Sequence, residues 1–221
     1  MEAILYAFNI NNTLFSLWGY DMSYLEFFGT VLNLISVYLV TRNNIWTWPI
    51  GNIAVILFAI LFFQIQLYSD LFEQIYFLIT GFYGWWVWVS LKKQAAAQLS
   101  DRSIRLNSQF SNGIYLAIII VGTIALGYFT SHIHEYFPTV FIMPASYPYL
   151  DAFTTVMSFA ATILMVHKKI ECWYLWVTVD VIGIWLYFAK GVVFVSFLYL
   201  VFLIMASYGL YNWRSLMRKY V

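Results

Sequence analysis

Long apolar stretches and short polar links alternate along nearly the whole chain. A helix needs about 20 mainly apolar residues to cross the hydrocarbon core of a bilayer. Seven stretches approach or reach that length, and polar or charged residues separate them. The pattern therefore predicts seven membrane-spanning helices, at residues 24–41, 45–64, 70–91, 113–130, 149–166, 172–189 and 194–213.

The links between these spans predict how the chain is organised. The most polar link separates three spans from four, and the link at 131–148 is rich in proline and aromatic residues, which suits a packed interfacial loop. The N-terminus lacks the basic start and small-residue cleavage site of a signal peptide, so we expect a retained interfacial segment. The expected parts are this segment (1–23), a first three-helix unit (24–91), a cytoplasmic linker (92–112), a connecting helix with an outer loop (113–148), a second three-helix unit (149–213) and a cytoplasmic tail (214–221).

Composition places the chain among all-α integral membrane proteins. Hydrophobic residues make up 63% of the 221 residues, aromatic residues 22% and charged residues only 10%, and the mean hydropathy is +0.77. These values lie far from those of soluble domains. A formal charge of +1 without a basic or acidic block gives no reason to expect nucleic acid as a partner. The single cysteine, Cys172, excludes an internal disulfide.

The basic residues predict the orientation of the chain in the membrane. Seven spans place the two ends on opposite sides, and short cytoplasmic loops carry an excess of lysine and arginine. All but one of the eleven Lys and Arg residues fall on the side of the C-terminus, and the exception is Lys190. We therefore expect a bacterial inner-membrane protein with its N-terminus outside and its C-terminus in the cytoplasm.

An internal repeat is suggested by short matches between the two halves. A shift of 128 residues aligns "WPIGN" (48–52) with "WVTVD" (176–180) and "GFYGW" (81–85) with "GLYNW" (209–213). A shift of 125 aligns "YLEFFGTV", starting at Tyr24, with "YLDAFTTV", starting at Tyr149, which implies a three-residue insertion in a loop. Coincidence among aromatic-rich helices is the alternative explanation.

Two units of three spans with one extra span between them point the same way through the membrane. Parallel repeats of this kind are typical of transporters that hold a substrate at the repeat interface near the midplane. The expected architecture is thus a 3+1+3 arrangement of helices.

The sixth span carries the most conspicuous polar group. Trp173, Trp176 and Asp180 are spaced so that they share one helix face, and a carboxylate in a span usually marks a cavity, a partner or a substrate. The alternative places Trp173 and Trp46 in the cytoplasmic aromatic belt and lets Asp180 bond a neighbouring helix. We interpret Trp46 as a belt residue and Trp176 with Asp180 as a site, since a belt requires no carboxylate deeper in the span.

The 128-residue register assigns partners to this site in the first unit. It matches Trp48 with Trp176 and Asn52 with Asp180, which predicts a polar pair flanked by indoles. Indole faces attract cations, and a desolvated carboxylate needs a positive partner, so a flat organic cation would fit. Further polar candidates at spanning depth are Asn33, Glu73 and Gln74.

Catalysis and metal binding find no support in the sequence. The three histidines do not show zinc-ligand spacing, and the spans offer a carboxylate without a histidine or metal set beside it. We expect no enzyme activity and no cofactor.

Three motifs together resemble the PnuC family of bacterial vitamin transporters, typified by nicotinamide riboside uptake. They are "FFQIQLYSDLFEQ" (62–74), "YGWWVW" (83–88), and Trp173 with Trp176 followed by "VTVDVIG". The resemblance covers essentially the whole chain. It implies a fold similar to SWEET sugar transporters, a homotrimer, facilitated diffusion, and trapping of the substrate by a cytoplasmic ribosylnicotinamide kinase. It also implies that Trp173 and Trp176 contact the substrate ring and Gln74 its polar atoms.

Three alternatives stay open at this point. Thiamine is also a cation, so the tryptophans do not separate it from nicotinamide riboside, whereas riboflavin is neutral and would leave Asp180 without a charged partner. A membrane protein that transports nothing, such as a scaffold, would leave Asp180 and its indoles unexplained.

Overall fold

The computed structural model describes residues 6, 8–17, 20–65, 68–98, 103–137, 144–191 and 193–219. Seven helices longer than four turns dominate this part of the chain, which forms two compact units, Met1–Asp101 and Arg102–Val221. Part of the expected cytoplasmic linker, at 99–102, and part of the expected outer loop, at 138–143, lie outside the described residues.

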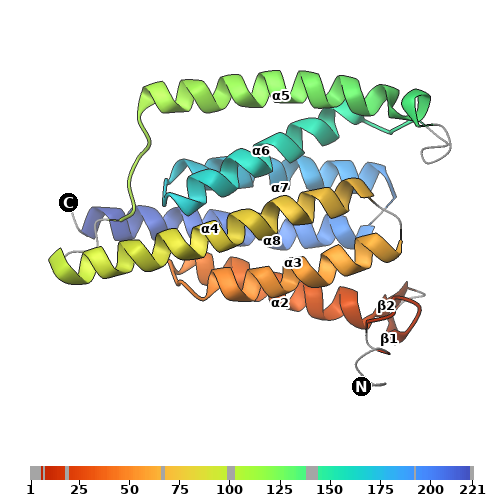
Figure 1. Cartoon of the computed structure of the whole chain (residues 1–221), viewed down its shortest axis with the longest axis horizontal. Coiled ribbons are helices and arrows are strands. Elements are labelled where there is room, and N and C mark those ends of the chain that lie inside the picture. Colours follow the sequence, from red (N-terminus) through yellow and green to blue (C-terminus); the bar gives the residue numbers. More distant parts are fainter. Residues whose placement is uncertain are drawn as a thin grey trace. The chain divides into compact units, whose positions relative to one another are not determined.

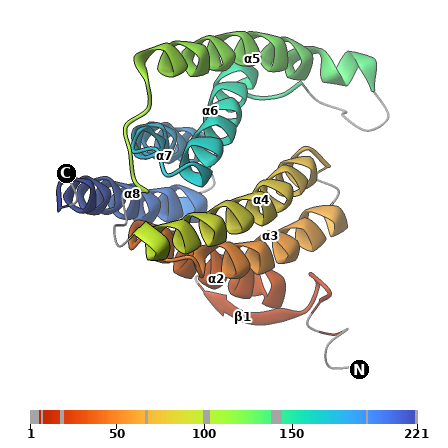
Figure 2. The same cartoon turned by 60° about the vertical axis from the view of Figure 1, so that its left-hand side comes forward.

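The first unit is a hairpin followed by three helices. Helix α2 packs on α3 and α3 packs on α4, so the three lie side by side (Figures 1 and 2). The elements are β1 (Thr13–Leu17), β2 (Tyr20–Ser23), α2 (Tyr24–Thr41), α3 (Thr47–Gln64) and α4 (Tyr68–Gln98).

The second unit contains four helices in a chain of pairwise contacts. Helix α5 packs on α6, α6 on α7, and α7 on α8. The elements are α5 (Gln109–Tyr136), α6 (Pro148–Val166), α7 (Glu171–Ala189) and α8 (Val193–Lys219).

The helices agree closely with the predicted spans. Each predicted span falls on one helix, with bounds that differ most for α4, α5 and α8, which continue into the flanking polar residues. Six of the described helices are long and apolar enough to cross a membrane, and α4 is not among these six. The all-helical membrane class is therefore confirmed.

Residues 13–17 and 20–23 of the N-terminal segment are the two strands of a β-hairpin. β1 and β2 pair antiparallel. The side chain of Gln64, at the end of α3, makes two hydrogen bonds to the segment before β1. It donates to the carbonyl of Phe8 at 2.7 Å and accepts from the amide of Ile10 at 3.0 Å. Ser23 ends the hairpin and N-caps α2 by accepting a hydrogen bond from the Glu26 amide.

The segment before α5, at residues 105–107, is hydrogen-bonded to the turn between α6 and α7 and to the first residue of α7. The amide of Arg105 donates to the carbonyl of Lys168 at 3.1 Å, and the amide of Ile170 donates to the carbonyl of Arg105 at 3.2 Å. Glu171 adds a carboxylate acceptor for the amide of Asn107 at 2.9 Å. The expected linker is therefore ordered here by backbone pairing.

Matching local features in the two units lie 125 residues apart. The turns after α2 and after α6 each contain a left-handed residue, Asn43 with φ 53° and Lys168 with φ 52°. The next residue of each turn donates to a helix carbonyl, from Asn44 to Leu39 at 2.9 Å and from Lys169 to Leu164 at 2.8 Å. Helices α3 and α7 end 125 residues apart, and α4 and α8 begin 125 residues apart.

This spacing corrects the register of 128 residues and the loop insertion. At a spacing of 125, Trp48 matches Trp173 rather than Trp176, and Asn52 matches Val177 rather than Asp180. The two polar residues therefore do not hold matching positions in the two units.

Candidate functional site

Two tryptophan pairs form matching edge-to-face contacts between neighbouring helices. Trp48 on α3 meets Trp88 on α4 edge to face, with ring centroids 5.4 Å apart and planes at 86°. Trp173 on α7 meets Trp213 on α8 at the same centroid distance and 88°. Such edge-to-face pairs stabilise a core beyond the area they bury.

In each pair, a glycine on the second helix leaves space for the tryptophan ring of the first helix. A Cβ on Gly209 would lie 2.5 Å from the Trp173 ring, and a Cβ on Gly84 would collide with the Trp48 ring. Trp173 is 1% exposed and Trp48 is 5% exposed. Both indoles therefore serve in packing α7 on α8 and α3 on α4, and their buried N–H groups have no hydrogen-bond partner among the residues that the structure describes.

Trp176 has different surroundings from Trp173. It is half-buried and packs against a cluster of Ile119, Met157, Ala160 and Val179, which come from α5, α6 and α7. Spacing along the helix predicts one shared face, but the two indoles pack against different partners. The structure thus separates the W-x-x-W pair into one residue that faces α8 and one that packs toward α5 and α6.

Asp180 is the buried carboxylate of α7, with 4% of its surface exposed. It is three residues from Gly183, where a Cβ would collide with the Tyr199 ring of α8, so the two share a helix face. Burying a carboxylate in a membrane-spanning helix is costly unless a cation or hydrogen-bond donors compensate it. Asp180 is therefore suited to a cationic ligand.

Asn52 is the buried amide of α3, with 6% of its surface exposed. Its Oδ1 lies against Gly81 of α4, so closely that a Cβ there would collide with it. Its Nδ2 is buried and has no hydrogen-bond partner among the described residues. A buried donor without a partner costs about 1–3 kcal/mol, so this amide is suited to an acceptor on a ligand.

The remaining candidates are less buried. Asn33 on α2 and Glu73 and Gln74 on α4 are half-buried. Glu73 has a further interaction of its own. The structure therefore gives Asn52 and Asp180 the strongest chemical signal among the predicted site residues.

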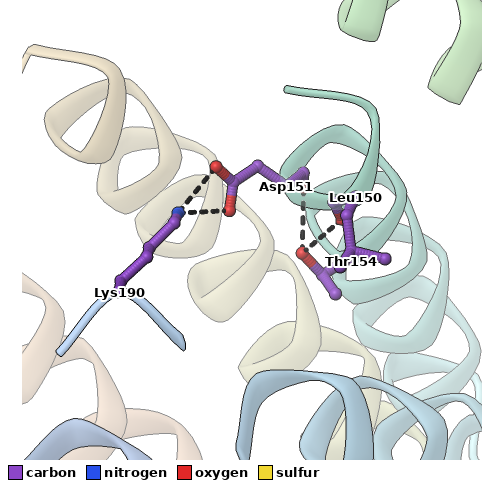
Figure 3. A network of polar contacts seen from close by, with 4 residues as sticks. All are labelled: Leu150, Asp151, Thr154 and Lys190. Carbon is purple, nitrogen blue, oxygen red and sulfur yellow. Dashed lines mark hydrogen bonds and ion pairs between the residues drawn. The ribbon is translucent and has the colours of Figure 1, made fainter. Parts of the chain in front are cut away.

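Sequence reasoning missed an ion pair between α6 and α7 (Figure 3). Lys190, which ends α7, donates to both carboxylate oxygens of Asp151 at 2.8 Å. Thr154 bonds back to the carbonyls of Leu150 and Asp151 in the first turn of α6 (Figure 3). The signal was present in the sequence, since Lys190 is the lone basic residue of its predicted side.

Metal chemistry has no candidate in the described part of the chain, where no group of three histidine, cysteine, aspartate or glutamate side chains is placed to hold an ion. Several buried polar side chains are already hydrogen-bonded to protein groups, as Ser36 is to Thr47 and Thr162 to the carbonyl of Ser158.

Comparison with known proteins gives consistent matches over nearly the whole chain. The family model described as nicotinamide mononucleotide transporter matches residues 23–215. The chain is 31% identical to the nicotinamide riboside transporter PnuC of Escherichia coli K12, over 91% of this chain and 89% of that protein. It is 26% identical to the riboflavin/roseoflavin transporter RibM of Streptomyces davaonensis, over 92% and 91%.

A solved structure supports the fold. The crystal structure of the vitamin B3 transporter PnuC matches with a TM-score of 0.66 and 22% identity, over 100% of this chain and 88% of that chain. At this identity the likeness concerns the fold alone. These relatives are transporters rather than enzymes.

Proposed function

Since the chain belongs to the nicotinamide mononucleotide transporter family, a family of multi-pass membrane proteins that carry small molecules, we propose that it takes up nicotinamide riboside by facilitated diffusion. Nicotinamide riboside joins a flat pyridinium cation to a carboxamide and a ribose. It therefore offers a positive charge for a carboxylate and acceptors for an amide donor.

The observation that carries the proposal is the burial of Asp180 in α7. A carboxylate at this place is compensated best by the positive ring of the substrate. The unpartnered amide of Asn52 supplies a donor for a carboxamide or hydroxyl oxygen, and the half-buried Trp176 supplies an indole face for the cation. Trp48 and Trp173 act in this proposal through helix packing rather than by touching the substrate.

Transport proceeds in the proposal by alternating access. The matching features at a spacing of 125 residues support two parallel repeats, α2–α4 and α6–α8, with α5 as the connecting helix of a SWEET-like 3+1+3 fold. The repeats rock as bodies in this mechanism. The N-terminus lies outside and the C-terminus in the cytoplasm, as the basic residues predict.

Two further parts of the proposal rest on the family resemblance alone. The protein assembles as a homotrimer in the bacterial inner membrane, and a cytoplasmic kinase traps the imported riboside. Cross-linking in native membranes tests the trimer, and uptake by cells without the kinase tests the trapping.

Titration calorimetry of the purified protein with nicotinamide riboside, thiamine and riboflavin tests the substrate. We expect the wild type to bind the riboside and the isosteric variant Asp180→Asn to bind it at least tenfold more weakly. Asp151→Asn is the matched control, because it removes a carboxylate of the same unit that is already paired with Lys190. Equal loss in both variants, or no loss in either, would contradict the role of Asp180.

Riboflavin is the second candidate, because RibM matches this chain over nearly its full length. Riboflavin is neutral, so its binding would not depend on the charge of Asp180. Binding of riboflavin alone, unchanged in Asp180→Asn, would identify a flavin transporter. Thiamine binding would keep the cation site but change the vitamin, and binding of none would favour a protein that transports nothing.

A further inference from the structure

We infer that Gly81 is a positioning residue that holds the carboxamide of Asn52 in its ligand-binding orientation, an inference that rests on the function proposed above. Gly81 itself touches no substrate in this scheme. It leaves the space on α4 into which one end of the Asn52 carboxamide fits, so that the other end stays unpaired and available to a hydrogen-bond acceptor of the ligand.

The contact between the two residues is closer than any side chain at position 81 allows. A Cβ built on Gly81 would overlap Asn52 Oδ1 and would lie 3.0 Å from its Cγ and 3.4 Å from its Nδ2. The colliding atoms form the end of a side chain with two rotatable bonds. An alanine at 81 would therefore turn the Asn52 carboxamide away while the helices stay packed.

No hydrogen bond from Nδ2 to the residues that the structure describes fixes the Asn52 carboxamide. Asn52 Nδ2 is buried and has no hydrogen-bond partner among the described residues. Nearby, Thr80 uses its hydroxyl to donate to the carbonyls of Tyr76 and Phe77 in its own helix. The close fit against Gly81 is thus the described contact that sets the direction of the amide.

The matching positions of the second unit support this pairing. At a spacing of 125 residues, Asn52 corresponds to Val177 and Gly81 corresponds to Ala206, which is fully packed in α8. Alanine stabilises a helix interior relative to glycine. In the second unit, Val177 on α7 is combined with Ala206 on α8, whereas in the first unit Asn52 on α3 is combined with Gly81 on α4. Glycine therefore occurs where the facing residue is asparagine, and the helix packing of the other unit does not require it.

A glycine needed only for close helix packing is the competing explanation, since small residues let membrane helices approach each other. The two explanations differ in what happens once the asparagine is gone. A packing glycine is needed whatever residue stands at position 52, whereas a positioning glycine becomes dispensable.

A double-mutant cycle separates these explanations. Nicotinamide riboside is titrated by calorimetry into the wild type, Gly81→Ala, Asn52→Ala and the double variant, and the thermal unfolding of each is recorded in detergent. We expect Gly81→Ala and Asn52→Ala each to weaken binding at least tenfold, and the double variant to bind no more weakly than Asn52→Ala. Gly29→Ala is the matched control, because the atoms nearest to its Cβ would be those of the Phe58 ring, at 3.3 Å or more, and we expect unchanged binding.

Losses that add in the double variant, or unchanged binding in Gly81→Ala, would overturn the inference. If Gly81→Ala fails to fold, the comparison of Asn52→Ala with the double variant still decides, because a further loss of binding in the double variant shows a packing role.

A second measurement uses the variant that combines Gly81→Ala with Asn52→Val. It reproduces the residue pair of the second unit and should unfold at the wild-type temperature or above. If the wild type binds thiamine or riboflavin instead of the riboside, the same cycle is measured with that vitamin. The proposed substrate can then be wrong while the positioning role of Gly81 is still tested.

Discussion

At the scale of single residues, burial and neighbours give tryptophans of similar sequence context different roles. Trp46 is 62% exposed at the start of α3, whereas Trp48, two residues on, is enclosed by Trp88 and Gly84. Trp173 repeats the enclosed arrangement in the second unit. The exposure of Trp46 agrees with its interpretation as a belt residue, and the burial of Trp173 favours a packing role over ring contact with substrate.

Truncating Trp173 should therefore act on stability. We expect Trp173→Ala to destabilise the protein by about 3–5 kcal/mol, the usual cost of removing a buried aromatic ring, and Trp46→Ala to leave it nearly unchanged. Thermal unfolding in detergent, followed by size-exclusion chromatography, measures both. A lower melting temperature for Trp46→Ala than for Trp173→Ala would contradict this assignment.

The glycine opposite Trp173 gives a second prediction at this scale. Gly209→Ala should lower the melting temperature, because the Trp173 ring occupies the space of the new methyl group. Gly113→Ala serves as control, since nothing lies within 4 Å of its Cβ in α5, and it should be neutral or slightly stabilising. Equal melting temperatures of the two variants would show that Trp173 can move aside at no cost.

At the scale of elements, side chains at helix ends bond other segments of the same unit. Gln64 joins the end of α3 to the segment before β1, and Lys190 joins the end of α7 to the start of α6. Side-chain bonds thus hold the polar ends of helices whose middles are held by packing.

The Gln64 contact should protect backbone amides from hydrogen exchange near residue 10 and not throughout the protein. We expect Gln64→Ala to speed hydrogen exchange in residues 8–12, because the Ile10 amide loses its acceptor, while the helices exchange as before. Exchange followed by mass spectrometry measures this, with the exposed Gln109→Ala as control. Unchanged exchange at residues 8–12 would show that the segment before β1 is held without Gln64.

The ion pair of Asp151 and Lys190 predicts a small effect. Both side chains are partly exposed, and such pairs contribute roughly 0.2–1 kcal/mol. A cycle of Asp151→Asn and Lys190→Met should give a coupling in that range by thermal unfolding, weaker at high salt. A coupling of several kcal/mol would show that the pair is shielded from solvent in the membrane.

At the scale of the whole molecule, the distribution of basic residues predicts the orientation of the chain in the membrane. The sole cysteine, Cys172, is buried, so Cys172→Ala gives a background for labelling. We expect Asn11→Cys to react with an impermeant maleimide in intact cells and Ser215→Cys to react only after lysis. Labelling in the opposite order would overturn the orientation, though not the fold.

The sequence by itself determined the number and positions of the helices, because hydropathy and length act locally and add up along a segment. It also singled out Asn52 and Asp180, since polar groups are rare in such spans and burying them has a cost. These signals need no knowledge of which helices touch.

Only the tertiary structure decided which positions match and which side chains meet. A slip of three residues is close to one helical turn, so registers of 125 and 128 place nearly the same face toward a neighbour, and aromatic-rich helices offer chance identities in both. Backbone hydrogen bonds in the turns and the ends of the helices distinguish the two. The fit of Asn52 against Gly81 likewise depends on how closely α3 approaches α4, because packing distance is a property of two helices together.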